Sequence, residues 1–113
     1  MAEFDYNGKK IETDDEGYLQ NLGDWDKGLA EVLAKQENVV LTEKHWKLID
    51  WIRDYFIKFQ VAPAIKTLAK EVMSIENLPD KKEANKFIDE LFPEGPAKQL
   101  AKIAGLPKPT GCV

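Results

Sequence analysis

The segment LTEKHWKLIDWIRDYFIKFQ, residues 41–60, carries the longest regular pattern in the chain. Its large apolar residues recur at the spacing of one helical face: Trp46, Ile49, Ile52, Phe56 and Phe59. Three more widen that face: Leu48, Trp51 and Tyr55. Thr42 can cap the helix, and Val61-Ala62-Pro63 ends it because the residue before a proline avoids helical angles. We therefore expect a central helix over Thr42–Phe59, buried around much of its girth.

Shorter patterns predict the other elements. The stretch EFDYNGKKIE predicts a hairpin, because Asn7-Gly8 supplies a type I′ turn between alternating segments. A lone hairpin is marginally stable in water, so this one is expected to lie against helices. Apolar spacing with capping and breaking residues predicts four further helices, over 23–38, 63–73, 82–92 and 96–105. Gly105 suits the position just after the last helix.

Length and composition favour one small domain. The chain has 113 residues and is 43% hydrophobic, which is enough for a packed core. It has no apolar run near the length of about eighteen residues that a membrane helix needs, and its start lacks a signal-peptide pattern. We expect a cytoplasmic, mainly α protein, a small bundle of about five helices with an N-terminal β-hairpin. The helical domain is expected over residues 1–104, followed by a flexible C-terminal arm over residues 105–113.

The charge is unevenly distributed. The net charge is −4, yet residues 42–70 carry six bases against three acids, and residues 93–113 carry three lysines against one glutamate. An anionic partner would be drawn to these two regions, or the bases are ordinary solvated helix surface.

The C-terminal arm presents a single thiol. Pro107 and Pro109 disfavour helix and favour extended polyproline geometry, and Gly111 forms a joint directly before Cys112. The last eight residues would reach about 25 Å, which suits delivery of Cys112 into another protein's cleft. A buried cysteine is the less favoured alternative, because terminal residues are seldom buried. The carboxylate of Val113 disfavours the thiolate, with only distant compensation from Lys108, so we expect Cys112 to become reactive in a partner's site.

Other catalytic constellations are missing from the sequence. One cysteine cannot form an internal disulfide, and with one histidine it cannot build a zinc cluster. No glycine-rich phosphate loop occurs, and we expect no cofactor or metal. His45 is expected to be an exposed or capping residue. No acid, base or metal in the sequence accompanies the thiol, so we do not expect turnover by the isolated protein.

The motifs of the chain resemble one known family. The ending LFPEGPAKQLAKIAGLPKPTGCV is similar to the C-terminus of the DsrC/TusE family of sulfur-relay proteins. The stretches DEGYL, DW, LTEKHWKLIDWIRDYF and APAIKTLAKEV resemble that family in order and spacing, so the similarity covers nearly the whole chain. The resemblance implies a small helical fold with a hairpin and a mobile arm. It also implies that the penultimate cysteine, Cys112, accepts sulfur as a persulfide from a donor protein and passes it on.

The resemblance leaves two pathways open. Members with a second arm cysteine work with dissimilatory sulfite reductase, and that cysteine corresponds to Ala101, which is either natural or an engineered replacement. Single-cysteine members relay sulfur for 2-thiouridine synthesis in tRNA, between a TusBCD-type donor and a tRNA thiouridylase. A lone thiol cannot close an internal disulfide, although the ending KPTGCV is more similar to the sulfite-reductase members.

Two further interpretations compete with a relay carrier. The chain could be a regulatory gamma-type partner of sulfite reductase, with the arm inserted into the enzyme. Alternatively, the helices over Thr42–Phe59 and Pro63–Met73 resemble a helix-turn-helix, whose outward residues Lys66, Thr67 and Lys70 would face nucleic acid. For the carrier, the expected arm and partner contacts are Gly105, Pro107, Lys108, Pro109 and Gly111, with Lys98 and Lys102 helping Lys108 to steer the arm toward an acidic cleft.

Overall fold

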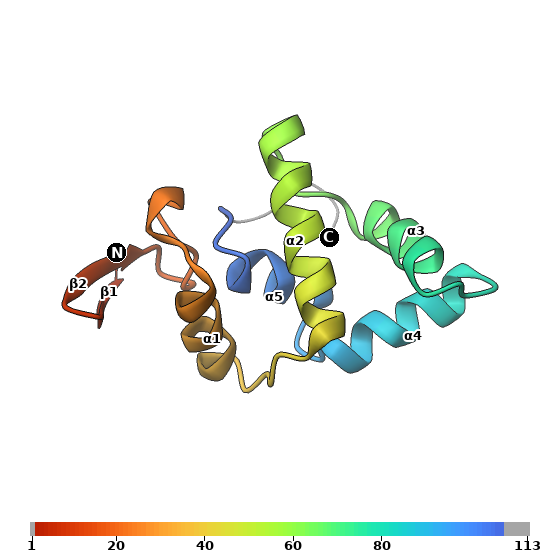
Figure 1. Ribbon diagram of the computed structural model, residues 1–113, viewed down its shortest axis with the longest axis horizontal. Helices are drawn as coiled ribbons and strands as arrows, with labels where there is room; N and C mark the ends of the chain where they lie inside the picture. The colour runs from red at the N-terminus through yellow and green to blue at the C-terminus, as the bar shows by residue number, and fades with distance from the viewer. Residues whose placement is uncertain (1, 108–113) are drawn as a thin grey trace.

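The structure, a computed structural model, describes residues 2–107, without the side chains of Ala2, Pro96 and Ala97. Its elements follow one another along the chain as β1 (Ala2–Tyr6), β2 (Lys9–Thr13), the 3-10 turn η1 (Leu22–Asp24), α1 (Lys27–Gln36), α2 (Glu43–Phe59), α3 (Ile65–Ile75), α4 (Lys81–Leu91) and α5 (Pro96–Ile103). The hairpin lies at one end of the molecule and the α3–α4 pair at the other, with α5 between them (Figure 1). The predicted mainly α fold with an N-terminal hairpin is confirmed for the described residues.

The hairpin forms as its turn residues predict. Asn7 and Gly8 both have positive φ, of 51° and 79°, which is the signature of a type I′ turn. The antiparallel register pairs Phe4 with Ile11, and Ile11 is completely buried. Tyr6 donates a hydrogen bond from its hydroxyl to Asp26 Oδ1 at 2.8 Å, which ties the hairpin to the start of α1. The expectation that the hairpin lies against the helices is therefore confirmed.

Helix α2 begins and ends close to the predicted boundaries. Thr42 is its N-cap and forms a capping box with His45, whose Nδ1 accepts a hydrogen bond from the Thr42 backbone N–H at 3.1 Å. Gln60 closes the helix in the left-handed conformation, with φ 60°. Helix α3 begins at Ile65, two residues later than predicted, because Ala64 is its N-cap and has extended backbone angles, φ −70° and ψ 160°.

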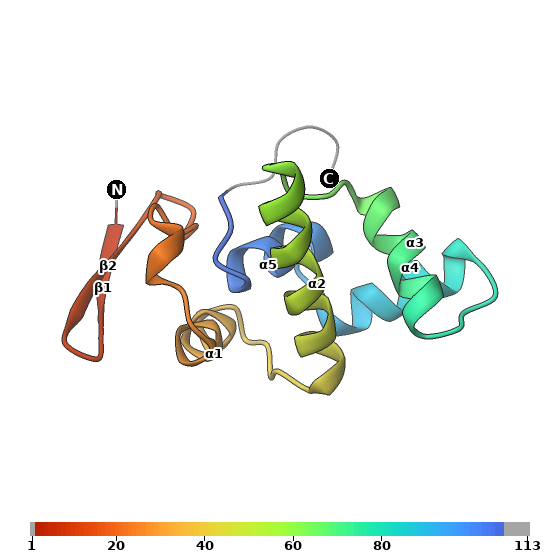
Figure 2. The same ribbon diagram turned by 45° about the horizontal axis from the view of Figure 1, so that its top comes forward.

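The apolar face of α2 is shorter than its sequence pattern. The buried residues are confined to its first ten positions: His45, Leu48, Ile49 and Ile52. Phe59 was predicted to face the core, but it is 57% exposed. The reason is tertiary, because the last turn of α2 projects past the helices that cover its earlier turns (Figures 1 and 2).

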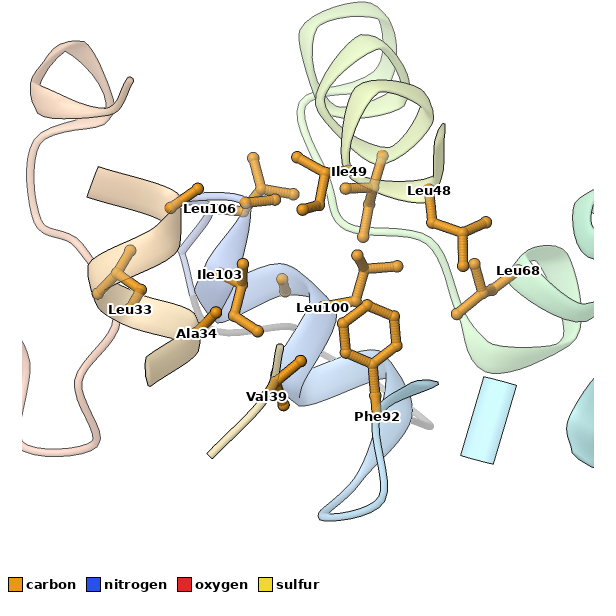
Figure 3. Packing of buried hydrophobic residues seen from close by; sticks show 14 of the residues in the cluster. Leu33, Ala34, Val39, Leu48, Ile49, Leu68, Phe92, Leu100, Ile103 and Leu106 are labelled. Atoms are coloured by element: carbon orange, nitrogen blue, oxygen red, sulfur yellow. The ribbon is translucent and has the colours of Figure 1, made fainter. Parts of the chain in front are cut away.

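Helix α5 is at the centre of the core. It contacts α1, α2, α3 and α4. Four residues in its C-terminal half and at its C-cap have no exposed surface: Leu100, Ala101, Ile103 and Ala104. Figure 3 shows side chains from the other elements converging on α5, among them Leu33, Ala34, Val39, Leu48, Ile49, Leu68 and Phe92. The segment that carries the arm is thus anchored in the best-packed part of the protein. No helix in the described part of the chain has the length and apolar character needed to cross a membrane.

Candidate functional site: the root of the C-terminal arm

The structure describes the first three residues of the predicted arm and not the thiol. Lys108, Pro109, Gly111 and Cys112 lie outside the described residues. Gly105 and Leu106 are buried, and Pro107 is the first exposed residue after α5. We call Gly105, Leu106 and Pro107 the arm root, and its geometry determines where the arm leaves the helical body.

Gly105 ends α5 in a Schellman motif. Its φ is +73°, its N–H donates to the Lys102 carbonyl at 3.1 Å, and the Leu106 N–H donates to the Ala101 carbonyl at 2.9 Å. The predicted position of Gly105 just after the helix is confirmed. Leu106 then inserts its side chain into the core beside α1 and α2, leaving it 2% exposed (Figure 3). The chain therefore turns sharply and is held in place before it reaches Pro107.

Two side chains from distant parts of the sequence hold the carbonyls at the end of α5. Trp25 donates from Nε1 to the Ile103 carbonyl at 2.9 Å, and Arg53 donates from Nη1 to the Ala104 carbonyl at 2.6 Å. The Arg53 guanidinium also lies 3.9 Å from the centre of the Trp25 ring. These carbonyls have no partner within their helix, and a cation at a helix C-terminus is favourable. We call Trp25 and Arg53 the arm clamp.

The arm clamp leaves no room for a side chain at position 105. A Cβ built on Gly105 would lie 2.3 Å from Cδ1 and 2.7 Å from Cγ of Trp25. Burial lowers the pKa of Arg53 from its usual value of 12.5, with Asp54 acting in the opposite direction. An arginine still carries its charge at neutral pH after such a shift. Glycine is thus required at the arm root both for its positive φ and for this close approach.

The arm clamp was not anticipated from the sequence. Trp25 and Arg53 lie 78 and 51 residues away from the carbonyls that they hold. One signal was available, since Arg53 is the only arginine in the chain and interrupts the apolar flank of α2. A unique arginine beside a buried helix face needs a fixed acceptor, but sequence spacing does not say which one.

The lysines predicted to steer the arm have different surroundings. Lys98 is exposed on α5. The Lys102 Nζ lies 3.4 Å from Glu37 Oε2 and 5.2 Å from the centre of the Tyr18 ring. Lys102 therefore ties α5 to the residue that follows α1. The structure places neither lysine at the arm clamp.

Position 101 lies in the core. Ala101 is completely buried on α5, and its carbonyl accepts the hydrogen bond from Leu106 that closes the Schellman motif. This is the position at which the family resemblance locates the second arm cysteine of two-cysteine members. The side chain here faces the interior of the protein, so it belongs to the packing around the arm root.

The remaining candidates lie away from the arm root. His45 is buried at the start of α2, and its Nε2 donates to the Leu91 carbonyl at 2.9 Å. Of the two predicted roles, exposed or capping, the capping role is confirmed by the hydrogen bond from the Thr42 N–H to Nδ1. Burial lowers the pKa of His45 from its usual 6.5. On α3, Lys66 and Lys70 are exposed and Thr67 is half-buried. Within residues 2–107, no group of three or more His, Cys, Asp or Glu side chains is arranged to hold a metal ion.

Comparison with known proteins gives a family for this architecture. The family model described as DsrC like protein matches residues 5–113. Sulfurtransferase TusE of Photorhabdus laumondii is 45% identical over 108 residues, which are 96% of each chain. The NMR structure of Allochromatium vinosum DsrC is 49% identical with a TM-score of 0.83, over 98% of this chain and 97% of that one.

A crystal structure has the same fold. It is the oxidized gamma-subunit of the dissimilatory sulfite reductase (DsrC) from Archaeoglobus fulgidus, 45% identical with a TM-score of 0.83. The alignment covers 99% of this chain and all of that one. These matches agree with the motifs in the helices and in the C-terminal arm. The chain therefore belongs to the DsrC-like protein family.

Proposed function

We propose that this protein is a sulfur-relay carrier, which accepts a sulfur atom as a persulfide on Cys112 and passes it to a partner protein. The observation that carries the proposal is the family match, which continues through the C-terminal arm to residue 113. Relatives over the full chain are named sulfurtransferase TusE and DsrC. The rigid arm root supports the proposal, because an anchored base lets a thiol six residues beyond Leu106 be presented from a constant position.

The transfer needs only the thiol of this chain. The Cys112 thiolate attacks the terminal sulfur of a donor persulfide, the sulfur–sulfur bond within the donor breaks, and the electron pair leaves with the donor thiolate. The new sulfur–sulfur bond is on Cys112, and no net oxidation occurs. In the second transfer step, a nucleophile of the acceptor attacks the outer sulfur of the Cys112 persulfide, and Cys112 leaves as thiolate. A reducing cytoplasm would keep Cys112 ready for this exchange.

The single cysteine favours a simple relay over an internal disulfide cycle. Ala101 contributes no second sulfur, so the carrier can hold a persulfide or a mixed disulfide with its partner. This favours a TusE-like role, between a TusBCD-type donor and a tRNA thiouridylase. The second candidate is a gamma-type partner of dissimilatory sulfite reductase. The likeness to the Archaeoglobus fulgidus gamma-subunit favours it, with a TM-score of 0.83.

Intact-mass spectrometry tests the proposal. The reduced protein is incubated with a persulfide-loaded TusBCD-type donor, and the mass should increase by one sulfur atom that dithiothreitol removes. The Cys112→Ser variant should show no increase. Undiminished protein-bound sulfur in that variant would refute the assignment. Loaded protein is then mixed with tRNA thiouridylase or with sulfite reductase, and the acceptor that discharges it separates the two candidate roles.

A further inference from the structure

Exposed apolar side chains gather at one end of α2. Among the described residues, Ile57, Phe59 and Val61 are 67%, 57% and 50% exposed. They take alternate positions within residues 57–61, on the last turn of α2 and just beyond it, and this turn projects from the body in Figures 1 and 2. We call Ile57, Phe59 and Val61 the α2 tip. A projecting group of large apolar side chains is typical of a protein contact surface.

One flank of the α2 tip is built from stacked rings. Trp51 and Tyr55 have ring centres 5.5 Å apart, and those of Tyr55 and Phe59 are 4.6 Å apart. Together with Asp54 and Lys58 these rings line a shallow hollow of about 190 Å³. Because each ring rests on its neighbour, Phe59 is held in place and little side-chain entropy would be lost on binding.

The other flank of the α2 tip adjoins the arm root. Ile57 follows Arg53 by four residues, so the two side chains are neighbours on the same helical face. Arg53 donates to the Ala104 carbonyl at 2.6 Å, immediately before Gly105. The described end of the chain lies beside α2 in both ribbon views (Figures 1 and 2). The apolar surface therefore begins about one helical turn, or about 5.4 Å, from the clamp that holds the arm root.

The length of the arm determines which surface a partner must cover. Cys112 is the fifth residue after Pro107, and this stretch spans at most about 18 Å when fully extended. A protein that takes Cys112 into its own site must approach the helical body within that distance of Pro107. The α2 tip begins about one helical turn after Arg53, the residue that holds the Ala104 carbonyl at the arm root, so such a partner comes within reach of it.

We propose that the α2 tip is the docking surface for the protein that exchanges sulfur with Cys112, an inference that rests on the proposed function. The partner should present an apolar hollow beside its sulfur site. Lys58, between Ile57 and Phe59, and Lys66, five residues after Val61, are both exposed, so acidic residues should flank that hollow. The arm would deliver the thiol, and the tip would supply the affinity that holds the two proteins together.

The test compares apolar residues at the two ends of α2. Ile57→Gln and Val61→Gln alter the tip at exposed positions, where folding should be unaffected. Val40→Gln is the matched control, because Val40 is 82% exposed and precedes the opposite end of α2, which is about 25 Å long. The probes are a persulfide-loaded TusBCD-type donor, dissimilatory sulfite reductase and inorganic polysulfide.

We expect the tip variants to raise KM for the protein donor, or Kd for the reductase, about tenfold, which is about 1.4 kcal/mol. Val40→Gln should leave both unchanged, and polysulfide should load every variant at the wild-type rate. Wild-type KM and Kd in the tip variants would overturn the docking surface. The docking surface would also be overturned if polysulfide loads the wild type but neither the donor nor the reductase acts on it. Failure of polysulfide to load Cys112 would instead overturn the proposed function, and the docking proposal with it.

Two other occupants of the tip give distinct results. If a second copy covers it, the wild type elutes as a dimer in size-exclusion chromatography and Ile57→Gln elutes as a monomer. If the protein's own arm covers it, Cys112 in isolated Ile57→Gln is alkylated faster than in the wild type. Either result would overturn a partner docking surface.

Discussion

Replacing Gly105 with alanine should damage the arm root through two separate effects. The backbone has φ +73°, which an L side chain adopts at a cost of about 1–2 kcal/mol. The added Cβ would also lie 2.3 Å from Cδ1, 2.7 Å from Cγ and 2.9 Å from Cβ of Trp25. Real Cβ atoms do not approach so closely, so the indole must move. It is held by its hydrogen bond to Ile103 and by the Arg53 guanidinium, and both contacts would be disturbed.

The size of the effect follows from these contacts. Losing the hydrogen bond between Trp25 and Ile103 costs about 0.5–1.5 kcal/mol, and losing the contact between Arg53 and the indole costs about 0.5–1 kcal/mol. Together with the cost of the positive φ, these losses mean that Gly105→Ala should lower the free energy of unfolding by about 2–4.5 kcal/mol. A small domain has a total stability of about 5–15 kcal/mol, so the variant should fold with a clearly reduced midpoint.

Urea unfolding followed by tryptophan fluorescence measures this loss. Gly8→Ala is the matched control, because Gly8 has φ +79° and a Cβ there would meet nothing within 4 Å. It should show the backbone term alone, about 1–2 kcal/mol. Equal losses in the two variants would refute the argument that Trp25 packs against Gly105. In a double-mutant cycle, Gly105→Ala should cost less in the Trp25→Ala background than in the wild type, because the obstructing ring is gone.

Two pH effects follow from buried titratable groups. Burial lowers the pKa of His45 below 6.5, so its stabilising contribution is complete above about pH 6.5 and decreases as the pH falls through the folded-state pKa. His45→Gln should abolish this decrease in urea titrations, and an unchanged slope would contradict the assignment. Burial, followed by the charges of Glu16, Asp14 and Glu37, raises the pKa of Tyr18 to about 12. Stability should therefore fall as the pH rises from about 10 to about 12. In an absorbance titration, the late phenolate step should be absent in Tyr18→Phe. Ionisation of all tyrosines near pH 10 in the wild type would contradict the raised pKa of Tyr18.

Features that depend on neighbouring residues were predicted well. The helix cap at Thr42, the type I′ turn at Asn7-Gly8 and the helix end at Gly105 each involve groups within a few residues of one another. Their geometry is set by backbone sterics and local hydrogen bonds, which act in the same way in any fold. The family motif is likewise readable in the chain, and it led to Cys112.

Features that depend on packing were not predicted. Phe59 continues the apolar spacing of α2, but only the arrangement of the helices shows that nothing in the described part of the chain covers most of its surface. Arg53 is conspicuous as the only arginine, but the sequence does not indicate that it and Trp25 hold the carbonyls at the end of α5. The pairing of these groups depends on which helices lie side by side, and that is decided by burial of the whole core.

The sequence alone determined the helices, the hairpin, the family and the placement of one thiol at the end of a proline-containing arm. Only the tertiary structure decided that the arm begins in the centre of the core, that Trp25 and Arg53 clamp its root, and that the tip of α2 projects beside it. The physical reason is the separation along the chain between the groups that interact. Turns, caps and helix ends are selected by contacts between neighbours in the chain, whereas burial and long-range hydrogen bonds exist only once the helices have packed.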